Sequence, residues 1–515
     1  MNGEAILPYL IIIPLFGAFS MPIVSLAGRK AREAWAVIIS GATLALGSAL
    51  FYYVWESGKI VLYTLGAKSP LGQGVNFPIR IVWEVDTFGA LMVLMVTFVS
   101  FMAVIYSLGY MKHDTGLDKY YTLIIILELG MLGIAITGDL FNFYVFLEIM
   151  SIASYALVAF RNDTWEGIEA GIKYMFVGSI ASSLILLGIA LLYGQYGTLT
   201  MGYLALKLSQ NPTVVGKVAL ALFIAGLLFK SGASPVHMWL ADAHPAAPSS
   251  ISAMLSGLVI KIGGIYALTR ILFSIYGTSI STKTVGWVII VFACITLIVG
   301  NAMAVIQTDM KRLLAYSSVG QIGYILLGIG IGLTAYGSQT GEIALAGAIY
   351  HTFNHALMKA LLFLIAGVVI HQLGTRNLNE LSGLAKTMPK TTFAFLIGAA
   401  AIIGMPPLNG FASKWLIYES SAIFNPLLGA IAIIGTAFCT AAYVRVLYTF
   451  FGRPSEKVMK AKDPEGTMLW PILILTIAII VMGLFPWQIS DKIMIPAVKT
   501  LENQLAYVST LLGGA

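Results

Sequence analysis

Long apolar runs, joined by short polar loops, make up most of this chain. Fourteen of them are long enough to cross a bilayer, which takes about 20 apolar residues per helix. Hydrophobic residues make up 58% of the sequence and charged residues only 10%, against about 25% charged residues in a soluble domain. We therefore predict an all-α polytopic membrane protein with about 14 transmembrane helices. The predicted spans are 5–27, 35–55, 86–109, 119–137, 140–160, 170–194, 214–243, 246–275, 285–307, 312–335, 342–372, 390–420, 426–451 and 468–490.

Two of these spans, the seventh and the twelfth, are interrupted. Gly232 and Pro235 break the seventh span just after Lys230. The run Met-Pro-Pro-Leu-Asn-Gly at 405–410 breaks the twelfth, and Lys414 follows it. Proline removes a backbone donor and interrupts a helix, and a lysine near the bilayer centre costs roughly 2.5–3.5 kcal/mol. Charged residues at discontinuous transmembrane helices are typical of ion and substrate pathways.

The order of spans and breaks predicts an internal repeat. Spans four to eight (119–275) and nine to thirteen (285–451) form two sets of five, and the fourth member of each set is broken. Five is odd, so consecutive copies enter the membrane from opposite faces, as in the inverted repeats of many transporters. Three helices with a long loop (1–118) precede the repeats, and one helix with a tail (468–515) follows them.

The basic residues predict the orientation of the chain. Sixteen of them flank the spans on one side, Lys311 among them, and eight lie on the other side. Because cytoplasmic loops carry the excess of Lys and Arg, we expect both termini outside the cytoplasm of a cell-membrane protein. The net charge of +7 belongs to these flanking loops and does not indicate nucleic acid. The longest loop, 56–85, alternates in polarity and predicts an extramembrane hairpin.

Ionisable residues at membrane depth are the candidates for ion movement. Glu148 lies near the middle of the fifth span, and pairing with Lys230 would satisfy both charges. The alternative is a static structural ion pair. Lys261 lies well inside the eighth span, where a lysine can carry a proton. Its alternative is a side chain that snorkels towards an interface.

A row of three ionisable residues occupies one face of the eleventh span. His351, His355 and Lys359 are spaced i, i+4, i+8, which places them along about 12 Å of one helix. Histidine titrates near physiological pH, so such a row can relay protons. A polar seam between helices is the alternative. A metal site would need further ligands, and none is evident, so we expect no metal here.

Lys414 has no acid to match Glu148 in its half of the chain. The corresponding tenth span offers Gln321, and Glu419, five residues further on, is a poor direct partner. An unpaired lysine suits a terminal proton donor or acceptor.

Secondary candidates lie near span ends or in other spans. His237 and His244 flank 238–243 at the cytoplasmic end of the seventh span and either connect the pathway to water or cap helices. Glu128 is a candidate side-pathway acid, and Asp139 either belongs to the pathway or caps the fifth span. We expect Arg270 to be structural.

Several motifs are missing from the sequence. It has no Walker loop, no dinucleotide fingerprint after a strand and no cysteine cluster for iron–sulfur ligation. Its two cysteines, Cys294 and Cys439, both lie in apolar spans. We therefore expect this chain to bind no cofactor and to perform no redox chemistry itself.

Three segments resemble motifs of one family, the proton-conducting antiporter-like membrane subunits. The run 228–248, with 252–257 and Lys261, closely resembles its core motif. The segments 351–364 and 139–148 resemble two others. The family includes antiporter-like subunits of complex I, the D subunit of Mrp sodium/proton antiporters, and subunits of archaeal membrane-bound hydrogenases and sulfane reductases.

This resemblance implies roles for the candidate residues. Glu148 and Lys230 would be a switching pair, Lys261, His355 and Lys359 a central hydrophilic axis, and Lys414 a distal gate. It also implies partners: other antiporter-like and small membrane subunits, and a peripheral redox module that carries the iron–sulfur clusters. We expect an ion-translocating subunit of a redox-driven complex that moves protons, sodium or both. The alternatives are an Mrp-type antiporter subunit and a non-conducting scaffold for a redox module.

Overall fold

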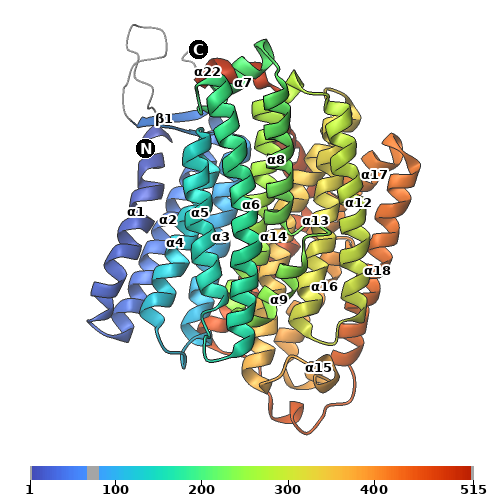
Figure 1. The fold of residues 1–515 in the computed structure, drawn as a ribbon. Helices are drawn as coiled ribbons and strands as arrows, with labels where there is room; N and C mark the ends of the chain where they lie inside the picture. Colours follow the sequence, from blue (N-terminus) through green and yellow to red (C-terminus); the bar gives the residue numbers. More distant parts are fainter. Residues whose placement is uncertain (1–2, 66–80, 512–515) are drawn as a thin grey trace.

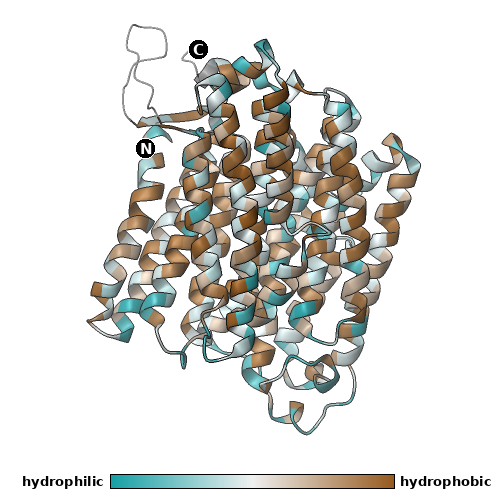
Figure 2. Cartoon of the chain, in the orientation of Figure 1, coloured by the Kyte–Doolittle hydropathy of each residue, from teal (hydrophilic) through white to brown (hydrophobic). Residues whose placement is uncertain are grey.

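The protein is a bundle of membrane-spanning helices (Figure 1). The computed structural model describes residues 3–65 and 81–511. Within these residues, 13 helices are long and apolar enough to cross a membrane. Hydrophobic residues predominate along the middle of the bundle and hydrophilic residues gather at its two ends (Figure 2). The chain is therefore a multi-pass membrane protein, as predicted.

Eleven of the spans are continuous α-helices. They are α1 (Gly3–Ser25), α2 (Arg29–Ser57), α3 (Thr87–Tyr110), α4 (Leu117–Ile136), α5 (Leu140–Val158), α6 (Trp165–Tyr196), α12 (Thr282–Ile306), α13 (Met310–Thr334), α14 (Gln339–Leu373), α18 (Pro426–Phe450) and α19 (Leu469–Leu484). Two more are discontinuous: α8 (Val214–Ser231) with α9 (Met238–Ala246), and α16 (Pro389–Ile403) with α17 (Asn409–Phe424). With the segment 249–276 they account for all fourteen predicted spans.

Both predicted breaks are present, and a glycine ends the first half-helix of each. Gly232 has φ 71° and its N–H bonds to the carbonyls of Leu228 and Phe229. Gly404 has φ 95° and caps α16 in the same way. Only glycine adopts this left-handed geometry without cost, so it is the usual residue after a helix end. The chain then crosses a short irregular stretch before it becomes helical again.

The segment 249–276 is irregular in a way that the sequence does not predict. It begins as α10 (Ser249–Met254) and continues through the π-helical stretches η1 (Leu255–Val259), η2 (Lys261–Tyr266) and η3 (Arg270–Tyr276), with α11 (Ala267–Thr269) between the last two. All of its residues are buried. Such π-helical geometry is rare and frequently marks functional sites. Like α13 and most of α14, it is buried inside the bundle.

The long loop after α2 contains the expected hairpin. Strand β1 (Val61–Leu65) pairs antiparallel with β2 (Ile81–Val85), with Val61 opposite Val85. The remainder of the predicted hairpin, 66–80, lies outside the described residues. The hairpin, α7 (Met201–Gln210) and both ends of the chain lie at the upper end of the bundle in Figure 1.

The tail after the last span is helical, which the sequence does not predict. It forms α20 (Pro486–Ile489), η8 (Ser490–Met494), α21 (Ile495–Glu502) and α22 (Gln504–Leu511). Gln504 Nε2 donates to the carbonyl of Ile275 at 2.9 Å, and the Tyr507 hydroxyl donates to Glu84 Oε1. The remaining short elements are η4 (Gly277–Ser279), η5 (Leu378–Glu380), α15 (Leu384–Thr387), η6 (Val458–Lys460) and η7 (Gly466–Met468).

Glycines let α12 and α13 approach closely. A Cβ on Gly300 would lie 2.3 Å from the backbone nitrogen of Gly320, and one on Gly323 would lie 2.4 Å from that of Leu297. Small residues of this kind bring transmembrane backbones together and strengthen their van der Waals packing. Of these two helices, α13 packs against α9 and α17, the second halves of both broken helices.

We predict that Gly300→Ala destabilises the protein by about 1–3 kcal/mol, the usual cost of overpacking. The matched control is Gly194→Ala in α6, where a Cβ meets nothing within 4 Å and where alanine favours the helix. Thermal unfolding of the purified protein in detergent checks this. Equal melting temperatures for the two variants would show that α12 and α13 are not tightly packed at this point.

A second prediction concerns pH and Glu84 in the hairpin. Burial raises the pKa of Glu84 from 4.5 to about 8, so the folded protein keeps a proton that the unfolded chain releases. Stability is then highest at low pH and falls as pH rises from about 4.5 to about 8. Melting temperatures measured across this range check the slope. Glu84→Gln should reduce it, and Glu456→Gln, at an exposed position, should leave it unchanged.

Candidate functional site

Lys230 lies at the last turn of α8, immediately before the break. Its side chain is 6% exposed. Its Nζ donates to the hydroxyls of Ser151 at 2.7 Å and Tyr155 at 3.3 Å, both on α5. Glu148, one turn earlier on α5, has its Oε1 4.0 Å from the same nitrogen. The amine is therefore held by hydroxyls with a carboxylate just beyond them.

Glu148 is only partly buried, although it lies near the middle of a predicted span. Its side chain is 28% exposed. The Ser182 hydroxyl on α6 donates to the same Oε1 that faces Lys230. A carboxylate at mid-span that is partly open at the protein surface can respond to a charge from outside this chain as well as to Lys230.

Lys261 begins the π-helical stretch η2 in the centre of the bundle. It is fully buried, so the alternative of snorkelling to an interface is wrong. Its Nζ donates to the carbonyl of Ser256, and the Ser256 hydroxyl lies 2.7 Å from that of Ser318 on α13. A hydroxyl–hydroxyl contact of this length is a good hydrogen bond. Ser256 thus joins Lys261 to the second half of the chain.

Lys359 lies on α14 at the other side of α13. Its Nζ donates to the Leu314 carbonyl at 2.8 Å, to Ser317 Oγ at 2.8 Å and to the Tyr443 hydroxyl at 3.2 Å. Ser318 Oγ donates to the same Leu314 carbonyl at 2.9 Å. Lys261 and Lys359 thus contact the same polar cluster from opposite ends, Lys261 at the Ser256 carbonyl and Lys359 at the Leu314 carbonyl, with the Ser256 and Ser318 hydroxyls between them.

The two histidines on α14 stack on each other, as their spacing predicts. The His351 and His355 rings are 5.9 Å apart and nearly parallel. His351 is fully bonded, with Nδ1 3.0 Å from Ser413 Oγ and Nε2 3.0 Å from Gln321 Oε1. Neither ring nitrogen of His355 has a partner among the described residues. Because a buried polar atom without a partner is costly, the His355 ring is the less well stabilised of the two.

Lys414 lies on α17 and reaches back across the second break. Its Nζ donates to the carbonyls of Ile402 at 2.8 Å and Ile403 at 3.3 Å, at the end of α16. The last carbonyls of a helix have no partner within it and carry the negative end of the dipole. The nitrogen also lies 4.6 Å from the centre of the Tyr324 ring. No carboxylate lies within ion-pair distance of it in the described part of the chain.

Gln321 and Cys439 link His351 to Lys414. Gln321 Oε1 accepts from His351 Nε2–H, and Gln321 Nε2 donates to Cys439 Sγ at 3.6 Å. Cys439 Sγ in turn lies 3.9 Å from the Ile402 carbonyl that Lys414 bonds. The tenth-span glutamine is thus a bridge in the second half, rather than the counterpart of Glu148.

The two histidines around α9 occupy different environments. His244 is fully buried, stacks on Phe363 with ring centres 4.4 Å apart, and has no partner on either ring nitrogen among residues 3–65 and 81–511. His237 precedes α9 without a side-chain capping bond. Helix capping, the alternative role of His237, is therefore absent.

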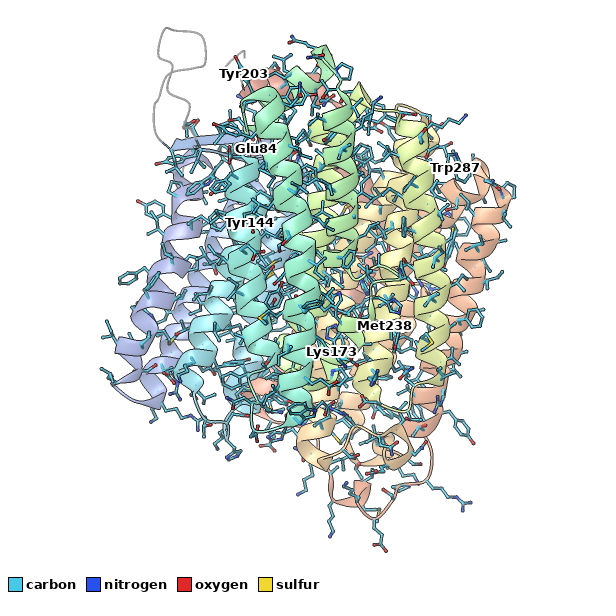
Figure 3. All side chains as sticks on the ribbon, in the orientation of Figure 1. Glu84, Tyr144, Lys173, Tyr203, Met238 and Trp287 are labelled. Carbon is cyan, nitrogen blue, oxygen red and sulfur yellow. The ribbon has the colours of Figure 1, made fainter. Side chains whose placement is uncertain are left out.

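A polar cavity of about 210 Å³ opens beside His244, at the end of the bundle opposite the termini. Lys173 on α6, which Figure 3 labels in the lower part of the molecule, and Arg312 on α13 bond Asp242 on α9 at 3.1 and 3.2 Å. Glu166, Glu169 and Pro245 also line the cavity. This vestibule brings water-exposed charges within one helical turn of a buried imidazole.

The remaining candidates have specific positions. Asp139 accepts from the backbone N–H groups of Phe141 and Asn142, both at 2.9 Å, and so caps α5. Glu128 is buried and accepts from Thr43 Oγ1 at 2.6 Å. Glu419 is exposed on α17, away from the buried row.

Sequence reasoning misses several polar residues of the row. Lys311 falls in a predicted basic loop, but it is 2% exposed and its Nζ donates to the Ala247 carbonyl at 2.5 Å. The serines that connect the lysines are not among the sequence candidates either. Adjacent serines inside an apolar span, such as Ser317 and Ser318, are the signal that would have found them.

Comparison with known proteins gives the family of this fold and site. Residues 137–440 match the family described as NADH:quinone oxidoreductase/Mrp antiporter, TM. Residues 73–121 match the N-terminus of complex I chain 5. The chain belongs to this NADH:quinone oxidoreductase and Mrp antiporter family, as its motifs predicted.

Individual relatives cover nearly the whole chain. The N subunit of the NADH-quinone oxidoreductase of Desulforudis audaxviator is 34% identical over 95% of this chain and 97% of its own length. The D subunit of the Na⁺/H⁺ antiporter of Alkalihalophilus pseudofirmus is 30% identical over 97% and 98%. The B component of hydrogenase-4 of Escherichia coli is 33% identical over 89% and 70%.

Two solved structures share the fold. A chain of the membrane-bound sulfane sulfur reductase, an archaeal respiratory membrane complex, matches with a TM-score of 0.87 and 32% identity over 98% of this chain and 99% of its own. A chain of the Mrp complex from Dietzia sp. matches with a TM-score of 0.86 and 26% identity over 100% of both chains. The protein is an antiporter-like subunit of a membrane complex.

The structural role of Arg270 generates a further prediction. Arg270 and Asp86 form a buried ion pair, with their side chains 6% and 3% exposed. Removing one partner leaves a buried charge, so Asp86→Ala should destabilise the protein by about 3–5 kcal/mol. Glu33→Ala, which breaks the partly exposed Arg29–Glu33 pair, should cost less than about 1 kcal/mol. Unfolding in detergent measures both; equal losses would contradict the assignment.

Proposed function

We propose that this chain translocates protons, sodium ions or both, as a subunit of a redox-driven membrane complex. The observation that supports this most is the row of buried amines and imidazoles between the two helix breaks. Lys230, Lys261, Lys359 and Lys414 are each at most 7% exposed. Cations at this depth are costly and mark ion pathways. The near-full-length likeness to the sulfane sulfur reductase chain supports a redox-driven host.

The proposed mechanism begins at the Glu148–Lys230 pair. When the amine lies against Glu148 the pair is neutralised; when it lies against Ser151 and Tyr155 its charge acts on the rest of the row. The Nζ–Oε1 distance of 4.0 Å is one small side-chain movement from direct contact. The charge of Lys230 then shifts the proton affinity of Lys261, since a neighbouring charge changes a buried pKa.

Proton transfer continues along the hydrogen bonds of the central row. Lys261 and Lys359 lie at the two ends of the polar cluster of Ser256, Ser318 and Leu314; because carbonyls only accept, water beside the two serine hydroxyls would carry the proton between the amines. His355, without partners among the described residues, is free to take up and pass on a proton, and His351 continues through Gln321 towards Lys414. Lys414 acts as the terminal donor; among the described residues its Nζ donates to the helix-end carbonyls of Ile402 and Ile403 and lies over the Tyr324 ring.

The vestibule beside His244 is the proposed entrance from the cytoplasm. Asp242 and Pro245 line it, and the buried His244 lies between them in the sequence. In this orientation both termini lie outside the cytoplasm of a cell-membrane protein. This orientation is supported by the excess of Lys and Arg on the side of the membrane away from the termini.

The partners we propose are other antiporter-like and small membrane subunits, with a peripheral redox module that carries the iron–sulfur clusters. The partly exposed Glu148 supports a neighbour at the α5–α6 face. A charge arriving there would reset the Glu148–Lys230 pair, which gives a way to couple distant electron transfer to ion movement.

An Mrp-type sodium/proton antiporter is a second candidate. The Na⁺/H⁺ antiporter relative from Alkalihalophilus pseudofirmus matches over 97% of this chain. The subunits that copurify with this chain distinguish the two functions. Small antiporter subunits alone would indicate the Mrp-type antiporter, and subunits with iron–sulfur clusters would indicate the redox-driven complex. A non-conducting scaffold is disfavoured, because a scaffold has no use for four buried lysines.

We predict that Lys230→Ala abolishes gradient formation while redox turnover of the assembled complex continues. The measurement is ion uptake by inverted vesicles that contain the native complex, with and without sodium. Glu148→Gln keeps the size of the side chain but removes its charge, and it should lower ion uptake at least about ten-fold. The reason is that removing one charge shifts the pKa of a neighbouring buried group, here the Lys230 amine, by about a unit or more.

Lys386→Ala is the matched control, because Lys386 is an exposed lysine on the short helix α15. It should pump like the wild type. Unchanged ion uptake by the assembled Lys230→Ala complex would contradict the proposed pathway and favour a non-conducting scaffold. Sodium-dependent uptake in the wild type, without any redox subunit in the preparation, would favour the Mrp-type function.

A further inference from the structure

An apolar groove runs along the outside of the bundle between α8 and α12. Its volume is about 480 Å³. Both helices begin at the end of the bundle that carries the termini (Figure 1). The groove is lined by Lys217, Leu220, Ala221, Ile224, Ala225 and Leu228 of α8 and, on the other side, by Ile280, Ser281, Thr284, Val285, Val288 and Phe292. The alanines provide the depth, because larger residues there would fill the space between the helices.

The length of the groove equals the depth of one leaflet. From Lys217 to Leu228 on α8, and from Ser281 to Phe292 on α12, the chain advances by eleven residues, or about 16 Å at the α-helical rise. Half of a hydrocarbon core of about 30 Å is about 15 Å. The groove therefore runs from the membrane surface to the midplane.

The mouth of the groove is positively charged. Lys217 lines it from the first turn of α8, and Lys283 lies exposed in the first turn of α12. Neither forms an ion pair within the described residues, and the lining contains no acid. Two helix N-termini add their partial positive charge at the same level. Such a mouth favours a phosphate group.

We propose that this groove binds an anionic glycerophospholipid, with one acyl chain between α8 and α12 and the phosphate at Lys217. The apolar lining, the leaflet-deep length and the charge at the mouth each correspond to one part of such a lipid. Leu228 lines the inner end of the groove, and Lys230, two residues later, turns towards α5. The acyl chain thus supports the back of the half-helix that carries Lys230.

The test is lipid binding to the purified native complex in detergent, measured by native mass spectrometry. Phosphatidylglycerol is titrated against phosphatidylcholine with the same chains. Phosphatidylglycerol should bind more tightly to the wild type, and Lys217→Glu should weaken it by about five-fold, which corresponds to about 1 kcal/mol for one basic residue beside an anionic lipid. Lys492→Glu, an exposed lysine at the same end, should leave the affinity unchanged.

A second variant tests the groove independently of charge. Ala225→Trp fills it and should abolish binding of both lipids, whereas Val218→Trp, 47% exposed and outside the lining, should not. Equal phosphatidylglycerol affinity for wild type, Lys217→Glu and Ala225→Trp would overturn the proposal. So would a crosslink from Ala221→Cys to a helix of another subunit, because that helix would then occupy the groove.

Discussion

The cost of holding positive charge in an apolar bundle governs this structure. Lys261, Lys359 and Lys414 are buried without carboxylates within ion-pair distance in the described residues, and carbonyls and hydroxyls hold them instead. Such partners stabilise the amine less than an acid does, so the charge stays responsive to its neighbours. Lys230, the fourth lysine of the row, differs from these three because a described carboxylate, that of Glu148, lies 4.0 Å from its amine. The Glu148–Lys230 pair therefore lies at one end of the row of buried lysines, and a change in this pair alters the electrostatic environment of the others.

The irregular backbone provides many of these partners. Lys414 bonds carbonyls that are available because α16 ends at Gly404, and Lys261 bonds a carbonyl within the π-helical segment. Inside a membrane such backbone is tolerated only where it is buried in protein or lines a cavity. The rigid frame around it, with α12 and α13 packed through glycines, keeps these irregular segments in register with one another.

Much of the fold was predictable, because span length and proline or glycine breaks follow directly from hydrophobicity and backbone chemistry. The fourteen spans, the two breaks, the hairpin and the capping by Asp139 all follow from local sequence. The inverted repeat stays a prediction. The π-helical segment, the burial of Lys311 and the exposure of Glu148 were not predictable, because they depend on which helix faces which. The same is true of Ser256 and Ser318, whose contact joins two spans.

The contacts of the C-terminal tail set an order of events during biosynthesis. Tyr507 bonds Glu84, 423 residues earlier in the chain, and Gln504 bonds the carbonyls at the end of η3. Membrane insertion proceeds from the N-terminus as the ribosome extends the chain. The contacts of the hairpin and of the end of η3 with this tail therefore form only after α22 has been synthesised. A product truncated before Tyr507 therefore lacks this hydrogen bond to Glu84.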